Sequence, residues 1–482
     1  MTLAHAQSSN GARLKIVLYN PRAVFFTMPL ALLAIGSELD PSKYEVVIVD
    51  GRLDPQPEKT VAAHLPGAVC LGVTVLTGAP ISDALAVSRA AKQARPDIPI
   101  VWGGWHPSMF GRECLREACV NITVQAQGEV TFAEIVERLV AGSSLEGCAG
   151  CMFRAADGSV RQNPPRALVA IDRFRAHDYN LIPVEAYYQL KGKRQLDYIS
   201  SQGCNFRCAF CSDPFVYGRK WVGLDPRTMV EKLREIHTRY PFDDVNFQDE
   251  TFFTKRDRVR AMAQDIVDSG LRFTWAATMR ADQGVRLPED VWQLCKQSGL
   301  RRLLVGVESG DPEMLKRIRK DVTLEQVFHT AEKMLDHDIA GIFPFIVGFP
   351  DESDKSVDAS IEVAKRLRSM SPSFETPIFY FKPYPGSSIV TEAVARGFKL
   401  PDTLEDWSQF DFVAGLPGPW VTPQRFTLIE RFKFFQDLAW KKARAGERWL
   451  QKLARYRCAR DEYRWPVEMR VLQWLRPAKR LS

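Results

Sequence analysis

The first third of the chain alternates short apolar runs with segments of helical spacing. Each apolar run is continuous rather than alternating in polarity, which is typical of strands buried on both faces of a sheet. Between the runs, apolar residues recur every three or four positions, as they do in amphipathic helices. This pattern predicts strands at residues 14–20, 45–50, 68–76, 98–102 and 121–126, and helices at residues 28–39, 80–94, 108–118 and 129–141.

Strands that alternate with helices predict an α/β fold with a doubly wound parallel sheet. Ligands of such sheets bind beyond the carboxyl ends of the strands. Glycines at two of these ends, Gly103-Gly104 and Gly128, permit the close approach of a bulky ligand or form tight turns. We therefore expect a ligand site among the residues that follow the strands, at 20–22, 50–52, 74–78, 103–108 and 128–131.

The alternation stops at residues 146–195, which we expect to be a linker that contains a hairpin. Asp157-Gly158, between short apolar runs, is a hairpin signal, and prolines at 164–165 interrupt regular structure. Cys148 and Cys151 form a C-x2-C pair here. Such a pair can bind metal or act in redox chemistry, but without a matching second pair we favour two ordinary thiols.

From residue 196 the alternation resumes and then gives way to a helical tail. Strands are predicted at 196–202, 243–248, 272–278, 301–307, 340–348 and 374–381, with helices near 226–239, 256–268, 288–298, 312–336 and 354–369. Six such units suffice for a partial (β/α)6 barrel, in which chemistry lies at the carboxyl ends of the strands. Residues 386–482 are helical, aromatic and basic. We interpret them as a helical cap, with a surface for a membrane or an apolar substrate as the alternative.

These changes of pattern divide the chain into four expected regions: residues 14–145, 146–195, 196–385 and 386–482. A chain of 482 residues is too long for one ordinary core. Its apolar content of 45% and charged content of 26% are typical of a folded globular protein. No apolar run approaches the roughly 20 residues that a membrane span needs.

Positive charge is concentrated in the tail. The formal net charge is +7 at pH 7, and from Lys441 onward 13 Lys or Arg oppose four acids. Residues 1–440 therefore carry a small net negative charge, which argues against a nucleic-acid partner. Ten cysteines are too few for a disulfide framework in a chain of this length. We expect a protein of the reducing cytoplasm.

The most informative chemistry lies in one short loop. Cys204, Cys208 and Cys211 follow a C-x3-C-x2-C spacing directly after the predicted strand at 196–202. Three thiolates on one loop can hold three irons of a 4Fe–4S cluster and leave the fourth iron open for another ligand. A structural zinc site would need four ligands, and no second ligand pair lies nearby. Three buried core cysteines are the alternative.

With Phe210 just before its last cysteine, this loop resembles the cluster-binding loop of the radical S-adenosylmethionine (SAM) enzymes. The resemblance implies that the open iron chelates SAM and that an electron from the cluster cleaves SAM to a 5′-deoxyadenosyl radical. It also implies that residues 196–385 form a partial (β/α)6 radical SAM barrel. The SAM-binding residues that it implies are Phe210 and Ile346 at the adenine, Asp249 and Glu250 at the amino group, Arg280 at the carboxylate, and Glu308 and Ser309 at the ribose.

The N-terminal sheet resembles the cobalamin-binding domain that precedes the radical SAM domain in one large subgroup. The resemblance rests on the strand order, the Gly-Gly-x-His-Pro-Ser loop at 103–108 and the Gly-Glu-x-Thr turn at 128–131. The cobalamin contacts that it implies are Thr74, Thr77, Gly103, Gly104, His106, Gly128 and Glu129. The D-x-H-x-x-G signature, whose histidine ligates cobalt from below, is absent. We therefore expect His106 to contact the corrin rim or a phosphate, and the lower axial ligand stays open.

Together the two resemblances imply a cobalamin-dependent radical SAM methyltransferase of class B, with a 4Fe–4S cluster, SAM and cobalamin as cofactors. One SAM would methylate cobalamin, and a second would supply the radical that abstracts hydrogen from an unactivated carbon. A cyclase or rearrangement enzyme, similar to the tetrapyrrole oxidative cyclases, is an alternative without methyl transfer. A non-catalytic cobalamin or iron–sulfur sensor is the alternative from another class.

The expected partners follow from the same reasoning. The substrate is a small or lipid-like metabolite, and an external electron donor such as flavodoxin or ferredoxin reduces the cluster. No nucleic acid is expected, and the C-terminal region is the candidate for peripheral membrane contact. Only Cys458 follows the predicted barrel, so we expect a single cluster.

Overall fold

The computed structural model describes residues 13–23, 26–384, 386–410, 417–440, 448–463, 466 and 468. The chain divides into two compact units. The first comprises residues 1–278, 297–300 and 383–413, and the second comprises residues 279–296, 301–382 and 414–482.

The elements of the first unit include two strand systems. Its strands are β1 (Leu14–Asn20), β2 (Tyr44–Asp50), β3 (Ala68–Thr74), β4 (Ile100–Gly103), β5 (Ile122–Val124), β6 (Cys151–Arg154), β7 (Val160–Gln162), β8 (Gln195–Tyr198), β9 (Ser201–Gly203), β10 (Trp221–Gly223), β11 (Asp244–Phe247) and β12 (Thr274–Met279). Its helices are α1 (Leu30–Glu38), α2 (Pro57–His64), α3 (Pro80–Ala94), α4 (Trp105–Cys114), α5 (Glu129–Val140), α6 (Val184–Lys191), α7 (Asp213–Val216), α8 (Pro226–Arg239), α9 (Arg256–Ser269), α15 (Ser388–Ala395) and α16 (Leu404–Ser408). Short 3-10 turns are formed by Ile171–Arg173, Tyr179–Leu181 and Phe252–Thr254.

The second unit holds the remaining elements. Its strands are β13 (Leu300–Val305), β14 (Ala340–Ile342), β15 (Phe345–Val347), β16 (Phe374–Glu375) and β17 (Ile378–Tyr380). Its helices are α10 (Ala281–Arg286), α11 (Glu289–Gln297), α12 (Pro312–Arg317), α13 (Leu324–Asp336), α14 (Asp354–Met370), α17 (Pro423–Trp440) and α18 (Arg448–Arg460).

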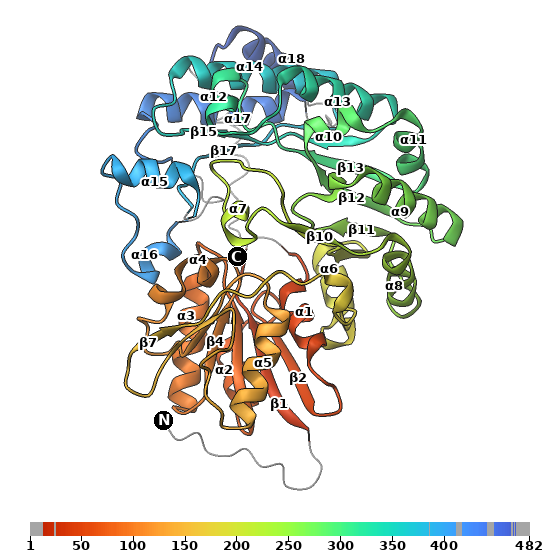
Figure 1. The fold of residues 1–482 in the computed structure, drawn as a ribbon. Coiled ribbons are helices and arrows are strands. Elements are labelled where there is room, and N and C mark those ends of the chain that lie inside the picture. Colours follow the sequence, from red (N-terminus) through yellow and green to blue (C-terminus); the bar gives the residue numbers. More distant parts are fainter. Residues whose placement is uncertain are drawn as a thin grey trace. The chain divides into compact units, whose positions relative to one another are not determined.

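A seven-stranded sheet of order β2-β1-β3-β4-β5-β6-β7 forms the N-terminal core, and helices cover both of its faces (Figure 1). Strands β1 to β5 are parallel. Side chains alternate along β1, so that Ile16 and Leu18 pack with α1 and α5, whereas Val17 and Tyr19 pack with α2 and α3. The predicted doubly wound parallel sheet is confirmed. Helix α2, which begins at Pro57, was not predicted.

The predicted hairpin is also confirmed. Strands β6 and β7 pair antiparallel, with Arg154 opposite Val160, and β6 pairs antiparallel with β5. Gly158 has a φ of +81°, a conformation that glycine adopts without steric cost. The hairpin therefore adds two antiparallel strands to the edge of the parallel sheet.

The six strands predicted after residue 196 are present as parallel strands, but three of them are interrupted. In the first unit β8, β11 and β12 pair in parallel, and in the second unit β13, β14 and β16 do so. Continuous strands at 340–348 and 374–381 were predicted wrongly, because Pro344 separates β14 from β15 and Pro377 separates β16 from β17. Proline has no N–H for a strand ladder. Strands β15 and β17 pair with each other instead.

The predicted strand at 196–202 is interrupted for a different reason. After β8 the N–H of Ser200 donates to a carboxylate oxygen of Asp249, at 2.8 Å, instead of to a neighbouring strand. Strand β9 then pairs antiparallel with β10. The chain therefore leaves the parallel strands just before Cys204.

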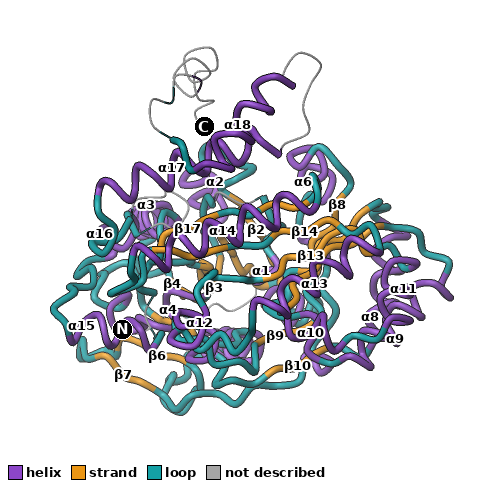
Figure 2. Tube along the Cα trace, turned by 90° about the horizontal axis from the view of Figure 1, so that it is seen from above, coloured by secondary structure: helices purple, strands orange, loops and turns teal. Residues whose placement is uncertain are grey.

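In the second unit, α17 and α18 lie side by side (Figure 2). Phe432 and Phe435 of α17 are fully buried, which favours packing over membrane contact for these two aromatic residues. Trp449 is 64% exposed, whereas Trp465 and Trp474, which we also noted in the basic tail, lie outside the described residues. No helix in the described part of the chain is both long and apolar enough to cross a membrane.

Candidate active site

A cavity of about 310 Å³ opens in the first unit at the carboxyl ends of β3, β4 and β5. Five of the residues predicted to contact cobalamin line it, namely Thr74, Gly103, Gly104, Gly128 and Glu129. The lining also includes Gln202, Tyr217 and Glu250, which lie close in sequence to the cysteines or follow β11. The cavity thus brings the strand ends of the N-terminal sheet together with residues of the cysteine-loop region.

Gly104 shapes the part of the cavity wall that follows β4. Its φ is +97°, and a Cβ atom at this position would lie 3.0 Å from the carbonyl oxygen of Val75 and 3.1 Å from Oγ1 of Thr74. The same carbonyl of Val75 accepts a hydrogen bond from the N–H of His106 at 3.0 Å. A side chain at position 104 would therefore be strained by its backbone and crowded by β3.

Thr77 and His106, which were also predicted to contact cobalamin, do not line this cavity. The His106 ring is fully buried beside Phe110 and Trp407, with ring centroids at 5.2 and 5.7 Å. Its Nδ1 atom lies 3.2 Å from Oγ1 of Thr77, and burial lowers the pKa of His106 to about 4. The structure places this histidine as a neutral core residue, and its contact with a corrin stays a prediction.

A polar bridge that the sequence did not indicate joins the two sides of the cavity. Nε2 of Gln127 donates to Oε1 of Gln202 at 2.8 Å, and Nε2 of Gln202 donates to Oε1 of Glu129 at 3.0 Å. Glu129 is buried, and desolvation raises its pKa. Gln202 precedes Cys204 by two residues, so the bridge ties the turn after β5 to the start of the cysteine loop. Glutamines carry no sequence signal of such pairing.

The three cysteines lie on the loop between β9 and α7 and are partly buried. The loop folds back on itself, because the N–H of Cys211 donates to the carbonyl of Cys208 at 3.3 Å. Burial raises the pKa of the Cys211 thiol, and the nearby Cys204 and Cys208 thiols raise it further. Phe210, predicted to contact adenine, lies in the same loop and is half-buried.

Nearby contacts hold this loop in place. Gly203 has a φ of +82° and pairs with Trp221 of β10. The carbonyl of Ala209, between the second and third cysteines, accepts from the N–H of Ile389 at 3.2 Å. Within the described residues, no three histidine, cysteine or carboxylate side chains converge on a point where they could bind one metal ion.

Asp249 and Glu250 were predicted together, but the structure gives them different surroundings. Both carboxylate oxygens of Asp249 accept hydrogen bonds, from the N–H and Oγ of Ser200 and from Oγ of Ser201. The carboxylate is 1% exposed, and desolvation raises its pKa, an effect that the Arg258 cation opposes. Asp249 therefore fixes the turn between β8 and β9, and does not line the cavity.

Glu250 does line the cavity. One carboxylate oxygen accepts from the N–H of Gly203 at 3.2 Å. Burial, and next the Asp213 carboxylate, raise the pKa of Glu250 to about 8. Within the described residues Glu250 forms no ion pair, and an ammonium group brought into the cavity would supply a cationic partner.

The other four residues predicted to bind SAM lie in the second unit. Arg280 begins α10 and donates through Nε to Asp282 at 3.0 Å and through Nη2 to the carbonyl of Lys320. Glu308, with a φ of +70°, pairs with Nζ of Lys320 at 2.7 Å, and its carbonyl accepts from the N–H of Ile346 at 2.8 Å. Ser309 is fully buried and its Oγ lies 3.3 Å from Oγ of Ser360. Lys320, which the sequence did not indicate, thus links the predicted carboxylate-binding and ribose-binding residues.

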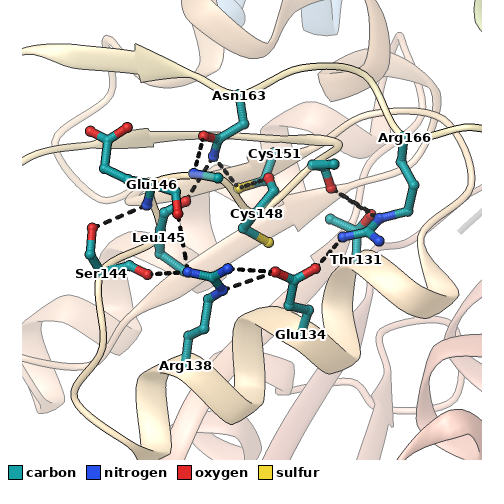
Figure 3. A network of polar contacts seen from close by, with 12 residues as sticks. Thr131, Glu134, Arg138, Ser144, Leu145, Glu146, Cys148, Cys151, Asn163 and Arg166 are labelled. Carbon is teal, nitrogen blue, oxygen red and sulfur yellow. Dashed lines mark hydrogen bonds and ion pairs between the residues drawn. The ribbon is translucent and has the colours of Figure 1, made fainter.

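Cys148 and Cys151 are buried inside a polar network at the edge of the N-terminal sheet (Figure 3). Sγ of Cys151 lies 3.3 Å from the carbonyl of Cys148 and accepts from Nδ2 of Asn163 at 3.3 Å. Arg138 and Arg166 both contact Glu134 beside them. Neither residue is exposed, and their role as ordinary thiols stays a prediction.

Comparisons with known proteins agree with this arrangement. Residues 18–136 match the B12 binding domain, and residues 198–364 match the Radical SAM superfamily. An uncharacterised methyltransferase of Pyrococcus horikoshii is 30% identical over 404 residues, which cover 82% of this chain and 85% of that protein. The chain therefore belongs to the radical SAM superfamily, in the group whose members carry a B12 binding domain.

Two further relatives illustrate the range of that group. The anaerobic magnesium-protoporphyrin IX monomethyl ester cyclase of Synechocystis is 24% identical over 399 residues, which cover 81% of this chain and 78% of that protein. The structure of the radical SAM methyltransferase TsrM from Kitasatospora setae, with cobalamin and a 4Fe–4S cluster bound, matches with a TM-score of 0.69 at 17% identity. That match covers 81% of this chain and 76% of TsrM, and it supports the fold.

The protein is thus a radical SAM enzyme whose cofactors are a 4Fe–4S cluster, SAM and cobalamin. The residues present fit these groups. The cysteine loop offers three thiols, the cavity is lined on its N-terminal side by glycines and mostly apolar side chains, and Glu250 presents a buried carboxyl to the cavity.

Proposed function

We propose that this enzyme methylates an unactivated carbon of a small or lipid-like metabolite. The observation that carries the proposal is the shared cavity, which is lined both by the strand ends of the N-terminal sheet and by Gln202 and Tyr217, which flank the cysteine loop. When bound, the cluster and SAM supply a 5′-deoxyadenosyl radical and cobalamin supplies a transferable methyl group. Methyltransferases among the relatives, including the protein of Pyrococcus horikoshii, support methyl transfer.

In this proposal the residues of the chain bind and orient the cofactors. Cys204, Cys208 and Cys211 ligate the cluster, and Glu250 accepts hydrogen bonds from the amino group of SAM. Gly103, Gly104 and Gly128 let the backbone approach the corrin ring closely. In this proposal Asp249 does not contact SAM itself. It accepts hydrogen bonds from Ser200 and so fixes the turn that leads into the cysteine loop.

The second unit contributes the remaining SAM contacts in this proposal. Arg280 binds the carboxylate of SAM, Glu308 and Ser309 bind its ribose, and Ile346 packs against the adenine. An external one-electron donor of the flavodoxin or ferredoxin type reduces the cluster. The basic C-terminal helices are the proposed site of peripheral membrane contact if the substrate is a lipid.

The test is anaerobic reconstitution of the full chain with iron, sulfide, cobalamin and SAM, followed by incubation with extracts of lipids and small metabolites. Methyl transfer predicts equal amounts of 5′-deoxyadenosine and S-adenosylhomocysteine, and a product heavier than its substrate by one CH2. A labelled methyl group on SAM should appear in that product. If 5′-deoxyadenosine forms and no label reaches any product, the proposal of methyl transfer is refuted.

The second candidate is oxidative cyclisation or rearrangement without methyl transfer. The similarity to the Synechocystis cyclase over most of both chains supports it. This activity predicts 5′-deoxyadenosine without S-adenosylhomocysteine, and a product that has not gained CH2. The same reconstitution therefore separates the two candidates.

A further inference from the structure

Lys320 of the second unit is a buried cation to which the proposed function gives no role. Its side chain is 7% exposed, and that of its partner Glu308 is 9% exposed. Nζ of Lys320 donates to Oε1 of Glu308 at 2.7 Å. A buried ion pair seldom adds stability over apolar residues of similar size, because both charges lose their hydration. The presence of the pair therefore points to a role beyond stability.

The backbone beside β13 leaves space for this ion pair. A Cβ atom at Gly306, directly after β13, would lie 2.7 Å from Nζ of Lys320 and closer still to Oε1 of Glu308. The N–H of Glu308 donates to the carbonyl of Pro344 at 3.0 Å, and its carbonyl accepts from the N–H of Ile346 at 2.8 Å. Glu308 is thus held by its backbone as well as by its side chain.

The backbone of Lys320 is fixed as firmly. Its two neighbours, Arg319 and Asp321, have φ values of +52° and +54°. Residues other than glycine adopt such conformations at a cost, and keep them where the surrounding structure imposes them. The carbonyls of Lys320 and Asp321 accept from Nη2 of Arg280, at 2.5 and 3.5 Å. The main chain of Lys320 therefore contacts Arg280, while its side chain contacts Glu308.

The Glu308 carboxylate keeps one oxygen available for a ligand. Within the described part of the chain, Lys320 is the one residue that donates a hydrogen bond to this carboxylate, and it does so to Oε1. A carboxylate that a cation holds by one oxygen presents the other oxygen in a fixed direction. A sugar hydroxyl can donate to that oxygen, and a hydrogen bond to a charged acceptor is about twice as strong as a neutral one.

We propose that Lys320 is a positioning residue for SAM, which holds the Glu308 carboxylate so that Oε2 accepts from a ribose hydroxyl. The inference rests on the proposed function, in which Glu308 binds the ribose of SAM. Lys320 itself does not contact SAM. Loss of its cation should weaken recognition of the ribose hydroxyls. Recognition of the SAM carboxylate by Arg280 should persist, because the backbone carbonyl at position 320 remains.

Analogues of SAM separate these two kinds of recognition. Calorimetry on the holoenzyme, reconstituted with iron, sulfide and cobalamin, measures Kd for SAM, for its 2′-deoxy and 3′-deoxy analogues and for decarboxylated SAM. In the wild type we expect at least one deoxy analogue to bind about tenfold weaker than SAM. The variant K320M should bind SAM as weakly as it binds that analogue. The ratio of Kd between decarboxylated SAM and SAM should equal the wild-type ratio.

A double variant separates positioning from folding. K320M leaves the Glu308 charge buried without its partner, which destabilises a protein, whereas replacement of both partners by apolar residues of similar size is often neutral. The urea midpoint should therefore fall in K320M and recover in E308M/K320M, and the double variant should still not distinguish SAM from the deoxy analogues. K316M is the matched control, because Lys316 is an exposed lysine of α12, and it should leave every Kd unchanged.

Two results would overturn the inference about Lys320 alone. The first is wild-type discrimination against the deoxy analogues in K320M while E308M loses it, which would mean that Glu308 binds the ribose without help from Lys320. The second is a smaller ratio for decarboxylated SAM in K320M, which would assign Lys320 to the carboxylate of SAM. If the wild type binds SAM and both deoxy analogues equally, the ribose contact in the proposed function is wrong, and the inference fails with it.

Discussion

The two sides of the cavity in the first unit differ in the residues that line them. The side formed by the N-terminal sheet is mostly apolar, with Gly103, Gly104 and Gly128 at the strand ends, a few neutral polar side chains, and Glu129 as its one charged residue. The side next to the cysteine loop has six lining residues, of which Gln202, Tyr217, Gln248 and Glu250 are polar. The first side can select a large ring by shape, and the second can select a charged ligand by hydrogen bonds.

This difference predicts two kinds of sensitivity. On the glycine side, added volume should matter and changes of charge should not. On the polar side, changes of charge should matter more than changes of volume. The polar side in turn depends on Asp249, which fixes the turn between β8 and β9.

The largest effect is expected from Asp249→Ala. The substitution removes the acceptor of three hydrogen bonds and leaves the cation of Arg258, which is buried and donates to Ser200, without its nearest carboxylate. Leaving a buried donor without its acceptor costs about 1–3 kcal/mol, and more where a charged group is involved. We expect a loss of this size in the free energy of unfolding, measured by urea denaturation of the apoprotein.

Asp249→Asn is the informative control. The amide keeps the shape and one acceptor oxygen but removes the charge, so it should recover part of the lost stability. If both variants unfold like the wild type, Asp249 does not hold the turn between β8 and β9, and the support of the polar side lies elsewhere.

The next effect concerns Glu250 and the pH dependence of SAM binding. The pKa of Glu250 is about 8 in the free protein, and an α-amino group such as that of SAM has a pKa of about 8. Below pH 8 the carboxyl becomes protonated, and above it the ammonium loses its proton. SAM affinity should therefore peak near pH 8 and fall on both sides.

Glu250→Gln should remove the acidic limb of this profile and weaken SAM binding about tenfold or more at pH 8. Glu129→Gln is the matched control, because Glu129 lines the other side of the cavity and its pKa is also raised. Calorimetry on the reconstituted protein checks both variants. Equal effects of the two substitutions would contradict the contrast between the sides.

Gly104→Ala tests the glycine side. The residue has a φ of +97°, and its new Cβ would lie 3.0 Å from the carbonyl oxygen of Val75. We expect a loss of about 1–2 kcal/mol in stability from the backbone conformation, and weaker cobalamin binding, measured from the absorbance of the retained corrin. SAM affinity should be unchanged. Gly128 has a negative φ of −92°, so Gly128→Ala separates added volume from backbone strain.

The two sides also differ in how far the sequence could predict them. Continuous apolar runs identified β1 to β5 because these strands are buried on both faces, and the glycines at the ends of β4 and β5 line the cavity. The strands after residue 196 were harder to predict. Pro344 and Pro377 interrupt two of them, and the hydrogen bonds of Asp249 interrupt the strand that precedes the cysteine loop. A local apolar pattern contains no information about a carboxylate 49 residues away that accepts from Ser200.

The candidate residues show the same limit. Spacing drew attention to Cys204, Cys208 and Cys211, because C-x3-C-x2-C places three thiols on one short loop, and their role as cluster ligands stays a prediction. Their environment was not predictable, so Asp249 and Glu250 received the same role although one of them supports a turn and the other lines the cavity. His106 was predicted to contact the corrin; its ring packs between Phe110 and Trp407 in the core, surroundings that its position after a strand did not indicate.

The smallest expected effect belongs to the bridge that joins the two sides. Gln202 accepts from Gln127 at 2.8 Å and donates to Glu129 at 3.0 Å. Each hydrogen bond is worth about 1 kcal/mol, so Gln202→Ala should cost about 1–2 kcal/mol of stability. A double-mutant cycle with Gln127→Ala should give a coupling energy of about 0.5–1 kcal/mol.

If the bridge links the two sides of the cavity, cobalamin binding should also protect the amide of Gly203 from hydrogen exchange in the wild type. The substitution Gln202→Ala should abolish that protection. Protection that persists in the variant would mean that the sides communicate through the bound ring itself, and then shape alone, rather than a hydrogen bond, would connect the cobalamin side to the cysteine loop.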